Sequence, residues 1–574
     1  MEKQHNRGQD GAGIATVKLN TEAGHQFMHR LRISGPQAIS QIFQNISIEV
    51  GELEKMYPEI LQHPGLMKGY MRFVGEVMLG HLRYGTQGKN NVEFCHPFIK
   101  PHINPTRNLT MAGNFNLVNT DELFDLLDQH PSGTLRESDL GAMIEVIHYY
   151  LCMADDTNPA QLNIEGILKQ ATTHFDGGYV FSGLIGNGDS FVMRDPNGIR
   201  PCYYYQTDEI VVAASERAAI MTSFNVKQED VHKLEPGHAL IVTKDGEVKN
   251  VEILTPRAHT ACSFERIYFS RGSDPDIYRE RMELGRNLAG TVLAALNNDL
   301  KNTIVSFIPN TAEIAFYGLI KGLEDYLKEI KLNRILNRKD MTEEELRELI
   351  GRRVRIEKIA IKDVKMRTFI TEDASRNEMV QHVYDITYGT VKRDVDTLVI
   401  IDDSIVRGTT LRESIIKMLN RLGPKRIIVV SSAPQIRYPD CYGIDMSRMG
   451  DFIAFQAAIG LLADKGQTHK LDEIYSQCKA AEAAGKLHEE NFVKGVYASF
   501  TDEDISKKIA AMLRHEEVTA EVDVIYQSLD GLHEACPHNT GDWYFTGNYP
   551  TPGGNRVANR AFMNYMEKQE KRGY

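Results

Sequence analysis

The sequence lacks the features that mark membrane, secreted and repeat proteins. In 574 residues no apolar run is long enough to span a bilayer, and the mean hydropathy is −0.35. No fixed period of the kind found in collagen, coiled coils or repeat arrays is present. The opening residues, MEKQHNRGQDGAG, hold no apolar stretch that would predict a secretory signal. We therefore expect a globular protein without a membrane span.

Cysteine is scarce, and its spacing shows no paired motif. There are 7 cysteines, an odd number, and none forms a C-x-x-C pair. This disfavours a secreted disulfide scaffold and predicts a cytoplasmic location, where thiols stay reduced. The cysteines are Cys95, Cys152, Cys202, Cys262, Cys441, Cys478 and Cys536.

An excess of positive charge is also missing. Lys and Arg number 66 against 78 Asp and Glu, for a net charge of −12, which disfavours nucleic acid as a main partner. Apolar residues make up 42% and charged residues 25%, as in ordinary globular proteins. The length predicts at least two domains, with room for three.

The first half, to about residue 260, contains short apolar segments separated by Gly, Pro and Asn turns. Their lengths and β-branched residues predict strands, with helices interspersed. This mixture, rich in hairpin signals, predicts an α+β domain built on antiparallel sheets. We expect strands at Gly13–Leu19, Val77–Leu82, Tyr179–Leu184, Ser190–Met193, Glu209–Ala214 and His238–Val242, and helices at Thr120–Asp128, Ser138–Met153 and Ile164–Thr173.

The pattern changes after Pro256. Helical spacing over Ile277–Leu296 precedes a strand at Thr303–Ile308 and a helix from Thr311 to about Leu327. The charge-dense stretch 329–356, with a capping box at Thr342, predicts a surface helical insertion. Further on, Asp396–Ile401, Thr409–Leu422 and Lys425–Ser432 predict one parallel β-α-β unit, with Gly423 at the helix C-cap. From about residue 471 the pattern is mostly helical.

The sharpest local signal is Val399–Thr410, VIIDDSIVRGTT. Its apolar run predicts a buried parallel strand, and Asp402 and Asp403 follow at the strand end, where open α/β sheets bind ligands. Two carboxylates there can bind ribose hydroxyls or Mg²⁺. The RGTT that follows offers backbone N–H groups, hydroxyls and a helix N-terminus for a phosphate. An acidic turn with an N-cap threonine is the structural alternative, but RGTT at a helix start favours a phosphate site.

This segment matches the phosphoribosyl-pyrophosphate (PRPP) motif of phosphoribosyltransferases. Ala433–Met446, Cys262–Arg271 and Arg194–Pro201 further resemble amidophosphoribosyltransferase, the glutamine-dependent PRPP amidotransferase that opens purine synthesis. The resemblance runs from Arg7 to about residue 465. It implies an α+β glutaminase domain of the N-terminal-nucleophile type, with stacked antiparallel sheets between helices, and then an α/β type I phosphoribosyltransferase domain with a parallel sheet. We place these domains at 1–260 and 261–470, with a helical insertion near 329–356 and a C-terminal helical extension at 471–574.

In the transferase half, the resemblance implies that Asp402 and Asp403 bind ribose and metal. Ile308–Ala312 (IPNTA) resembles the pyrophosphate turn, so Thr311 is expected to help hold pyrophosphate or Mg²⁺, although Ala312 replaces a further family hydroxyl. Lys362–Ile370 resembles the loop that closes over PRPP, without its Tyr-Gly element, and Arg367 is expected to contact phosphate. A helix N-cap for Thr311 and a solvated charge for Arg367 are the structural alternatives. The 5-phosphate is assigned to Ser404, Ile405, Val406, Arg407, Gly408, Thr409 and Thr410.

The reaction that the resemblance implies needs no protein nucleophile. Ammonia displaces pyrophosphate at the anomeric carbon of PRPP. Catalysis is expected from positioning, from Mg²⁺ on the leaving group and from a closed loop that excludes water.

In the glutaminase half, the resemblance implies that Arg83 grips the glutamine carboxylate and Asp139 its ammonium. Asn114 and the backbone N–H of Phe115 are expected to form the oxyanion hole. This chain has Gly-Asn-Phe-Asn at 113–116 where the family has His-Asn-Gly-Asn, and Phe115 adds bulk beside the hole. A surface charge, a turn residue and a helix cap are the structural alternatives for Arg83, Asn114 and Asp139.

The family's nucleophile is an N-terminal cysteine followed by a strand and a helix. Here the corresponding later segment is His5–Asp10, and only Met1–Gln4 precede it. We therefore expect a chain without the nucleophilic cysteine and without glutamine hydrolysis, either as a truncated reading frame or as an ammonia-dependent variant. Cys95 is internal and cannot act with a free α-amino group.

One branch of the family carries a [4Fe–4S] cluster held by four cysteines. Cys262 and Cys441 stand at two of those places, Gly541 and Tyr544 at the other two, and Cys536 at a shifted position. Because three candidates do not make a four-thiolate site, we expect no iron–sulfur cluster.

The expected partners are PRPP, glutamine or ammonia, and purine nucleotides as feedback inhibitors, and the chain is expected to form a homo-oligomer. A base phosphoribosyltransferase and a nucleotide-binding regulatory protein with this fold are the alternatives. A base phosphoribosyltransferase would have no use for an amide-cleaving domain. Turnover of PRPP with ammonium would distinguish the enzyme from a regulatory protein that only binds nucleotides.

Overall fold

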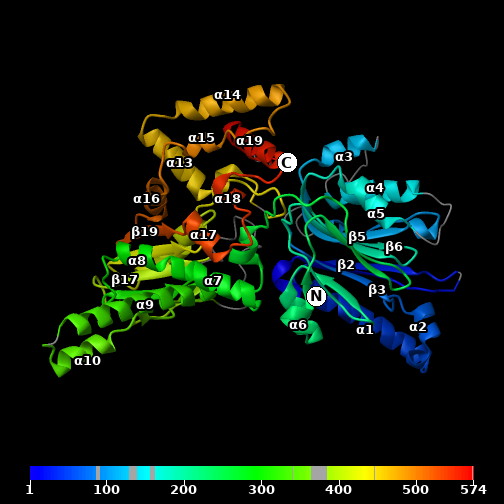
Figure 1. Cartoon of the computed structure of the whole chain (residues 1–574), viewed down its shortest axis with the longest axis horizontal. Coiled ribbons are helices and arrows are strands. Elements are labelled where there is room, and N and C mark those ends of the chain that lie inside the picture. Colours follow the sequence, from blue (N-terminus) through cyan, green and yellow to red (C-terminus); the bar gives the residue numbers. More distant parts are fainter. Residues whose placement is uncertain are drawn as a thin grey trace.

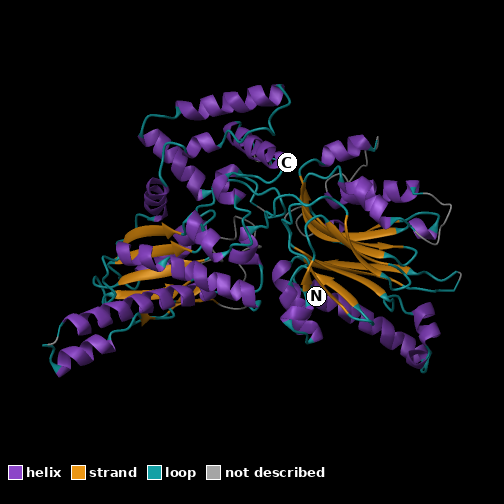
Figure 2. Ribbon diagram, viewed as in Figure 1, coloured by secondary structure: helices purple, strands orange, loops and turns teal. Residues whose placement is uncertain are grey.

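The computed structural model describes residues 1–574 except 23, 86–90, 128–138, 155–161, 339, 363–383, 445, 570, 572 and 574. The chain forms two lobes, one from each half of the sequence, and each lobe is built around its own sheets (Figures 1 and 2). No helix within the described ranges is both long and apolar enough to cross a membrane.

The N-terminal lobe stacks antiparallel sheets between helices. A six-stranded sheet has the order β12-β11-β7-β6-β5-β4, and two three-stranded sheets have the orders β2-β1-β3 and β10-β8-β9. Helices α3 to α5 lie over the large sheet and α1 lies under the β1–β3 sheet (Figure 1). The strands are β1 (Gly11–Val17), β2 (Met28–Ser34), β3 (Val77–Arg83), β4 (Phe98–Lys100), β5 (Leu109–Leu117), β6 (Gly177–Ile185), β7 (Ser190–Arg194), β8 (Tyr203–Gln206), β9 (Val211–Ala214), β10 (His232–Lys233), β11 (His238–Val242) and β12 (Val248–Glu252), and the helices are α1 (Ala38–Met56), α2 (Pro64–Tyr70), α3 (Thr120–Leu126), α4 (Asp139–Met153), α5 (Ile164–Thr172) and α6 (Arg217–Phe224).

The C-terminal lobe is built on a five-stranded sheet with the order β14-β13-β17-β18-β19. Every pairing in it is parallel. The strands are β13 (Thr303–Phe307), β14 (Arg355–Ile356), β17 (Thr397–Asp402), β18 (Arg426–Ser431) and β19 (Glu521–Tyr526), with a separate pair, β15 (Ala360–Lys362) and β16 (Tyr384–Ile386).

Helices cover both faces of this sheet, so its central strands are buried throughout: Leu398 to Ile401 of β17 are 0% exposed. The helices are α7 (Pro275–Asn287), α8 (Ala289–Ala295), α9 (Glu313–Asn337), α10 (Glu343–Gly351), α12 (Ile416–Asn420), α13 (Ile453–Asp464), α14 (His469–Ala483), α15 (Lys494–Tyr497), α16 (Asp502–Leu513), α17 (Leu529–Ala535), α18 (Trp543–Thr546) and α19 (Pro552–Met566).

The two lobes are joined by polar contacts, of which those around Glu265 are buried. Arg7, in a short 3₁₀ helix over Glu2–Arg7, lies 2.7 Å from Glu265, and Arg200 lies 3.2 Å from the same carboxylate. At the other end of the chain, Arg556 of α19 binds Glu122 of α3 at 2.5 Å. The chain's first and last elements therefore both tie the lobes together.

The fold class predicted from the sequence is confirmed, with antiparallel sheets followed by a parallel one. Several boundaries were wrong. The helix expected at 277–296 is divided into α7 and α8 at Leu288, and α9 runs unbroken across the expected start of the insertion at 329. The tail after 471 was expected to be a helical extension, but β19 lies in it and pairs with β18 as part of the parallel sheet.

Candidate active site

The predicted phosphate loop lies at the centre of the parallel sheet. β17 ends at Asp402, and a helix follows that opens with a π-helical turn over Leu411–Ile415. The loop between them thus sits at the carboxyl edge of the middle strand, which is the usual ligand site of such sheets. Asp402, Asp403 and Ser404 are partly exposed there, whereas Ile405 is buried and fixes the loop to the core.

Hydrogen bonds within and around the loop hold the two carboxylates. The Asp403 N–H donates to Asp402 Oδ1 at 2.9 Å, and the Ser404 hydroxyl donates to Asp403 Oδ1 at 3.0 Å. Ser432, which follows β18, donates from its hydroxyl to the Asp403 carbonyl at 3.1 Å. The acidic pair is therefore held by the neighbouring strand as well as by its own loop.

Gly408 meets a backbone requirement of the loop. Its φ is +72°, in the left-handed region that favours glycine. A Cβ at this position would lie 2.4 Å from Cδ1 of Ile453 and 3.0 Å from Cδ2 of Leu513. The Gly408 carbonyl accepts from the Arg412 N–H at 2.9 Å and so begins the helix that follows the loop.

The turn predicted to bind pyrophosphate, Ile308–Ala312, follows β13 at the same edge of the sheet. β13 and β17 are parallel neighbours with Phe307 opposite Ile401, so the turn that carries Thr311 follows its strand beside the acidic pair. Arg407 points to Asp451 at 2.9 Å. Arg367, expected to contact phosphate, lies outside the described residues.

The sequence did not single out Arg281 of α7. It is 4% exposed and donates to the backbone carbonyls of Arg266, Tyr268 and Ser270. Burial lowers the pKa of Arg281 to about 10, while the charge of Asp403 opposes this shift. A buried cation therefore lies near enough to Asp403 to feel its charge.

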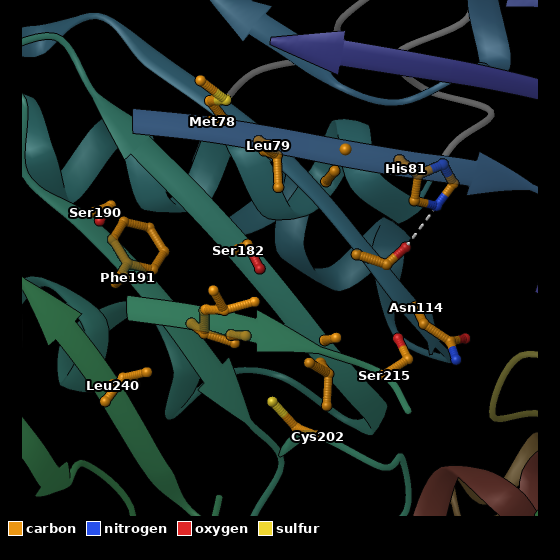
Figure 3. A pocket seen from close by; sticks show the side chains of 18 of the residues that line it. Met78, Leu79, His81, Asn114, Ser182, Ser190, Phe191, Cys202, Ser215 and Leu240 are labelled. Carbon is orange, nitrogen blue, oxygen red and sulfur yellow. Dashed lines mark hydrogen bonds between the residues drawn. The ribbon is translucent and has the colours of Figure 1, made fainter. Parts of the chain in front are cut away.

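The two predicted glutamine-binding residues, Arg83 and Asp139, and the predicted oxyanion-hole residue Asn114 line one cavity of about 1060 Å³. They come from separate elements: Arg83 ends β3, Asn114 is in the middle of β5 and Asp139 begins α4. Figure 3 shows part of this cavity, with Leu79 and His81 on one wall and Asn114, Ser182 and Phe191 on others. The tertiary structure thus brings together residues that the sequence separates.

Arg83 is a buried cation rather than the surface charge of the alternative. It is 4% exposed, donates to the Asn91 carbonyl at 3.1 Å and packs over the ring of Phe94. Its strand end is fixed by Asp10, whose N–H donates to the Arg83 carbonyl at 3.0 Å and whose carboxylate accepts from the Gly85 N–H at 2.6 Å.

Asn114 lies in a strand, so the turn alternative is wrong. It pairs with Val180 of β6. The preceding peptide is held by two histidines: His81 Nε2 is 3.1 Å from the Gly113 carbonyl oxygen, and His96 Nδ1 is 3.4 Å from the Gly113 N–H. Burial lowers the pKa of His81 to about 4 and that of His96 well below its ordinary value. Both rings are therefore neutral at pH 7, and His96 can accept while His81 donates.

The surroundings of Asn114 and Asp139 also follow from the fold. The Phe115 ring stacks on His96 at a centroid distance of 5.6 Å. The large side chain that follows Asn114 is therefore packed against a histidine. Asp139 Oδ2 accepts from the Leu117 N–H at 3.0 Å and so connects the start of α4 to the end of β5. His81 and His96 were missed by the sequence reasoning; the His81-Leu-Arg83 spacing on one strand was the available signal.

Cys262, Cys441 and Cys536, the cysteines at or near the cluster positions of the family, are all 0% exposed. Cys262 Sγ is 3.3 Å from the Tyr544 hydroxyl, and its backbone bridges to Gly541. Burial raises the pKa of Cys262 to about 12 and raises those of Cys441 and Cys536. With Gly541 and Tyr544 at the other two positions, these residues do not supply the four thiolates of a [4Fe–4S] site. Within the described ranges, no three His, Cys, Asp or Glu side chains are grouped to hold a metal.

Comparisons with known proteins agree with this architecture. No family model matches the chain. Curated amidophosphoribosyltransferases do: that of Pasteurella multocida is 27% identical over 501 residues and covers 85% of each chain. That of Bacillus subtilis is 27% identical over 510 residues (88% of this chain, 87% of the relative), and that of Escherichia coli is 28% identical over 474 residues (79% and 78%).

Solved structures show the same fold. The glutamine PRPP amidotransferase of B. subtilis, complexed with ADP and GMP, superposes with a TM-score of 0.60 at 23% identity, over 96% of this chain and 93% of that one. A structure described as the allosteric regulatory enzyme of purine biosynthesis gives 0.61, over 96% and 92%. The chain is therefore a relative of the amidophosphoribosyltransferases over most of its length, and it has the two-domain fold of the PRPP amidotransferases.

Proposed function

We propose that this chain is an amidophosphoribosyltransferase of de novo purine synthesis. It would form 5-phosphoribosylamine from PRPP and ammonia and release pyrophosphate. The observation that carries the proposal is the Asp402–Thr410 loop, which lies at the carboxyl end of the central strand in a chain whose curated relatives bear this name over 85% of its length.

In this proposal the loop positions PRPP. The backbone and hydroxyls of 404–410 hold the 5-phosphate at the helix start, and Asp402 and Asp403 bind the ribose hydroxyls. Thr311, on the neighbouring turn, lies on the side of the leaving pyrophosphate. Catalysis consists of holding the anomeric carbon in line with ammonia while water is excluded.

The donor set fits Mg²⁺. Asp402 and Asp403 offer partly exposed carboxylates, and the ion prefers a few carboxylates together with water and substrate phosphate oxygens. When bound, Mg²⁺ supplies charge neutralisation for the leaving pyrophosphate. Thr311 is a further candidate ligand. An iron–sulfur cluster is not part of the proposal, because Tyr544 stands beside Cys262.

Ammonia is the proposed nitrogen source for this chain. Cys202 lines the cavity, but burial raises the pKa of its thiol to about 12, so it is not a thiolate at neutral pH. Cys95 is 0% exposed and burial raises its pKa as well. Arg83, Asn114 and Asp139 are proposed to bind glutamine in the cavity without hydrolysing it.

The proposal also covers the cellular location of the protein and its binding partners. The 7 cysteines of the described structure are all free thiols, which supports a reducing cytoplasm. The B. subtilis neighbour is complexed with ADP and GMP, which supports purine nucleotides as feedback inhibitors here. Self-association into a homo-oligomer is also proposed. A base phosphoribosyltransferase is not favoured, because the relatives align over the N-terminal half as well.

Pyrophosphate release from PRPP with Mg²⁺ tests the proposal, comparing ammonium with glutamine. We expect release with ammonium and none with glutamine alone. Asp402→Asn with Asp403→Asn should lower the rate by at least about a hundredfold, because each lost charge-assisted contact is worth ~1.5–3 kcal/mol. Asp245→Asn, in an exposed turn of the other lobe, is the matched control. No release with either nitrogen source would refute the activity, and release with glutamine would refute the assigned nitrogen source.

A further inference from the structure

The helical hairpin of α9 and α10 projects from the transferase lobe (Figure 1). The first half of α9 packs on α7 so closely that a Cβ on Gly318 would lie 1.8 Å from the Met282 carbonyl oxygen. The second half leaves the body: in α9 the last buried residue is Leu327, and in α10 only Leu349 is buried. The hairpin is therefore anchored at its base and exposed at its end.

The exposed part of α9 carries an apolar stripe. Leu332, Ile335 and Leu336 are 47%, 39% and 65% exposed, and their spacing places them on one face of the helix. Ile350 of α10 adds a side chain that is 49% exposed. Large apolar side chains gathered on two turns of a projecting helix are typical of a contact surface.

The two helices of the hairpin carry opposite charge. The second half of α9 and its C-cap are positive, through Lys328, Lys331, Arg334 and Arg338 against Glu329. α10 is negative, through Glu343, Glu344, Glu345 and Glu348 against Arg347. Among the described residues, Asp325 at the base of α9 pairs with Arg286 of α7, and the other ion pairs of the hairpin are Arg347–Glu343, Arg352–Glu348 and Arg338–Asp340. None of these ion pairs joins α9 to α10, although Lys331 donates to the Arg352 carbonyl, which follows α10.

We propose that this hairpin is a self-association surface, occupied by the same hairpin of a second copy of the chain. A two-fold axis along the hairpin places α9 of each copy against α10 of the other, so a positive helix meets a negative one twice. The apolar stripes lie between them and form a four-helix contact. The two-fold symmetry makes one copy's charge pattern the complement of its partner's.

Sedimentation velocity of the full chain over the micromolar range tests the surface. Wild-type protein should self-associate, and Leu332→Glu with Leu336→Glu should weaken the association at least about tenfold, because two apolar side chains leave the contact in each copy. Ile103→Glu is the matched control, since Ile103 is 100% exposed on the other lobe. Circular dichroism and pyrophosphate release from PRPP should be unchanged in all of these proteins.

Charge reversal tests the arrangement independently. Arg334→Glu with Arg338→Glu makes both helices negative, and Glu344→Lys with Glu348→Lys makes α10 positive. Each variant alone should lose self-association, and an equimolar mixture of the two should recover it as a heterodimer. A wild-type chain that stays monomeric, as expected if another protein occupies the hairpin, would overturn the proposal. So would an oligomer that survives the leucine variant, or a mixture that shows no recovery.

Discussion

Replacing Gly408 by alanine tests whether the phosphate loop needs the conformation that the fold imposes. A left-handed φ, here +72°, costs alanine about 1 kcal/mol relative to glycine. The added methyl would lie 2.4 Å from Ile453 Cδ1, and Ile453 is held in place because its N–H donates to the Val406 carbonyl at 2.9 Å. The Ile453 and Leu513 side chains that meet this methyl are 4% and 0% exposed, so neither has room to move away, and such overpacking costs roughly 1–3 kcal/mol. Gly408→Ala should therefore lower the free energy of unfolding by about 2–4 kcal/mol.

Urea denaturation measures this change, and pyrophosphate release measures its effect on PRPP. Because the loop must shift to admit the methyl, the KM for PRPP should rise about tenfold or more. Gly466→Ala is the matched control: its φ is +64°, but a Cβ there would meet no atom within 4 Å. It should lose only ~1 kcal/mol and keep its KM. Equal destabilisation in the two variants, or an unchanged KM in Gly408→Ala, would refute the reasoning.

Three further predictions concern the N-terminal lobe. Arg7→Ala should destabilise the protein by ~3 kcal/mol, because the buried carboxylates of Glu216 and Glu265 both lose a cationic partner. Glu216 keeps only hydrogen bonds from Asn6 and the Arg271 N–H, and Glu265 keeps Arg200 and the Ser270 hydroxyl. Arg347→Ala, in an exposed pair, should cost under about 0.5 kcal/mol, and urea denaturation midpoints measure both changes. Burial depresses the pKa of His81 to about 4, so the unfolded chain binds protons first as pH falls, and the free energy of unfolding should drop from about pH 6.5 to about pH 4 and be fully present above that range. His81→Gln should reduce the dependence of the unfolding free energy on pH between about pH 4 and 6.5, whereas His63→Gln, at an exposed position, should leave it unchanged. The same pH dependence in both variants would contradict the depressed pKa of His81. Asp139→Asn keeps an oxygen for the Leu117 N–H but removes the charge, so calorimetry should show glutamine binding weakened about tenfold, with Asp245→Asn unchanged.

Local sequence patterns correctly predicted the strands and turns whose conformation depends on neighbouring residues. The strand His238–Val242 has the predicted bounds, and Gly423, expected at a helix C-cap, has a φ of +71°. The Asp402–Thr410 loop could be placed because strand, loop and helix follow one another directly in the chain. In each case the signal lies within a few residues, where side-chain size and backbone preference act.

The predicted boundaries of helices and strands were wrong where tertiary packing outweighed the local sequence pattern. α9 continues to Asn337 because its first half is held by α7, so the charged stretch from 329 extends the helix instead of starting a new one. β19 was assigned to the helical tail, since a six-residue run does not show which strand it will join. Its partner Arg426 stands opposite Glu521, far back in the chain.

The sequence by itself determined the order of the antiparallel and parallel folds and the position of the Asp402–Thr410 loop between a strand and a helix, because both depend on neighbouring residues. Only the tertiary structure decided that Arg83, Asn114 and Asp139 share one cavity, that His81 and His96 hold the peptide before Asn114, and that Tyr544 stands beside Cys262. These contacts join residues that are distant in the chain. Sheet pairing and burial set such distances, and no local preference encodes them.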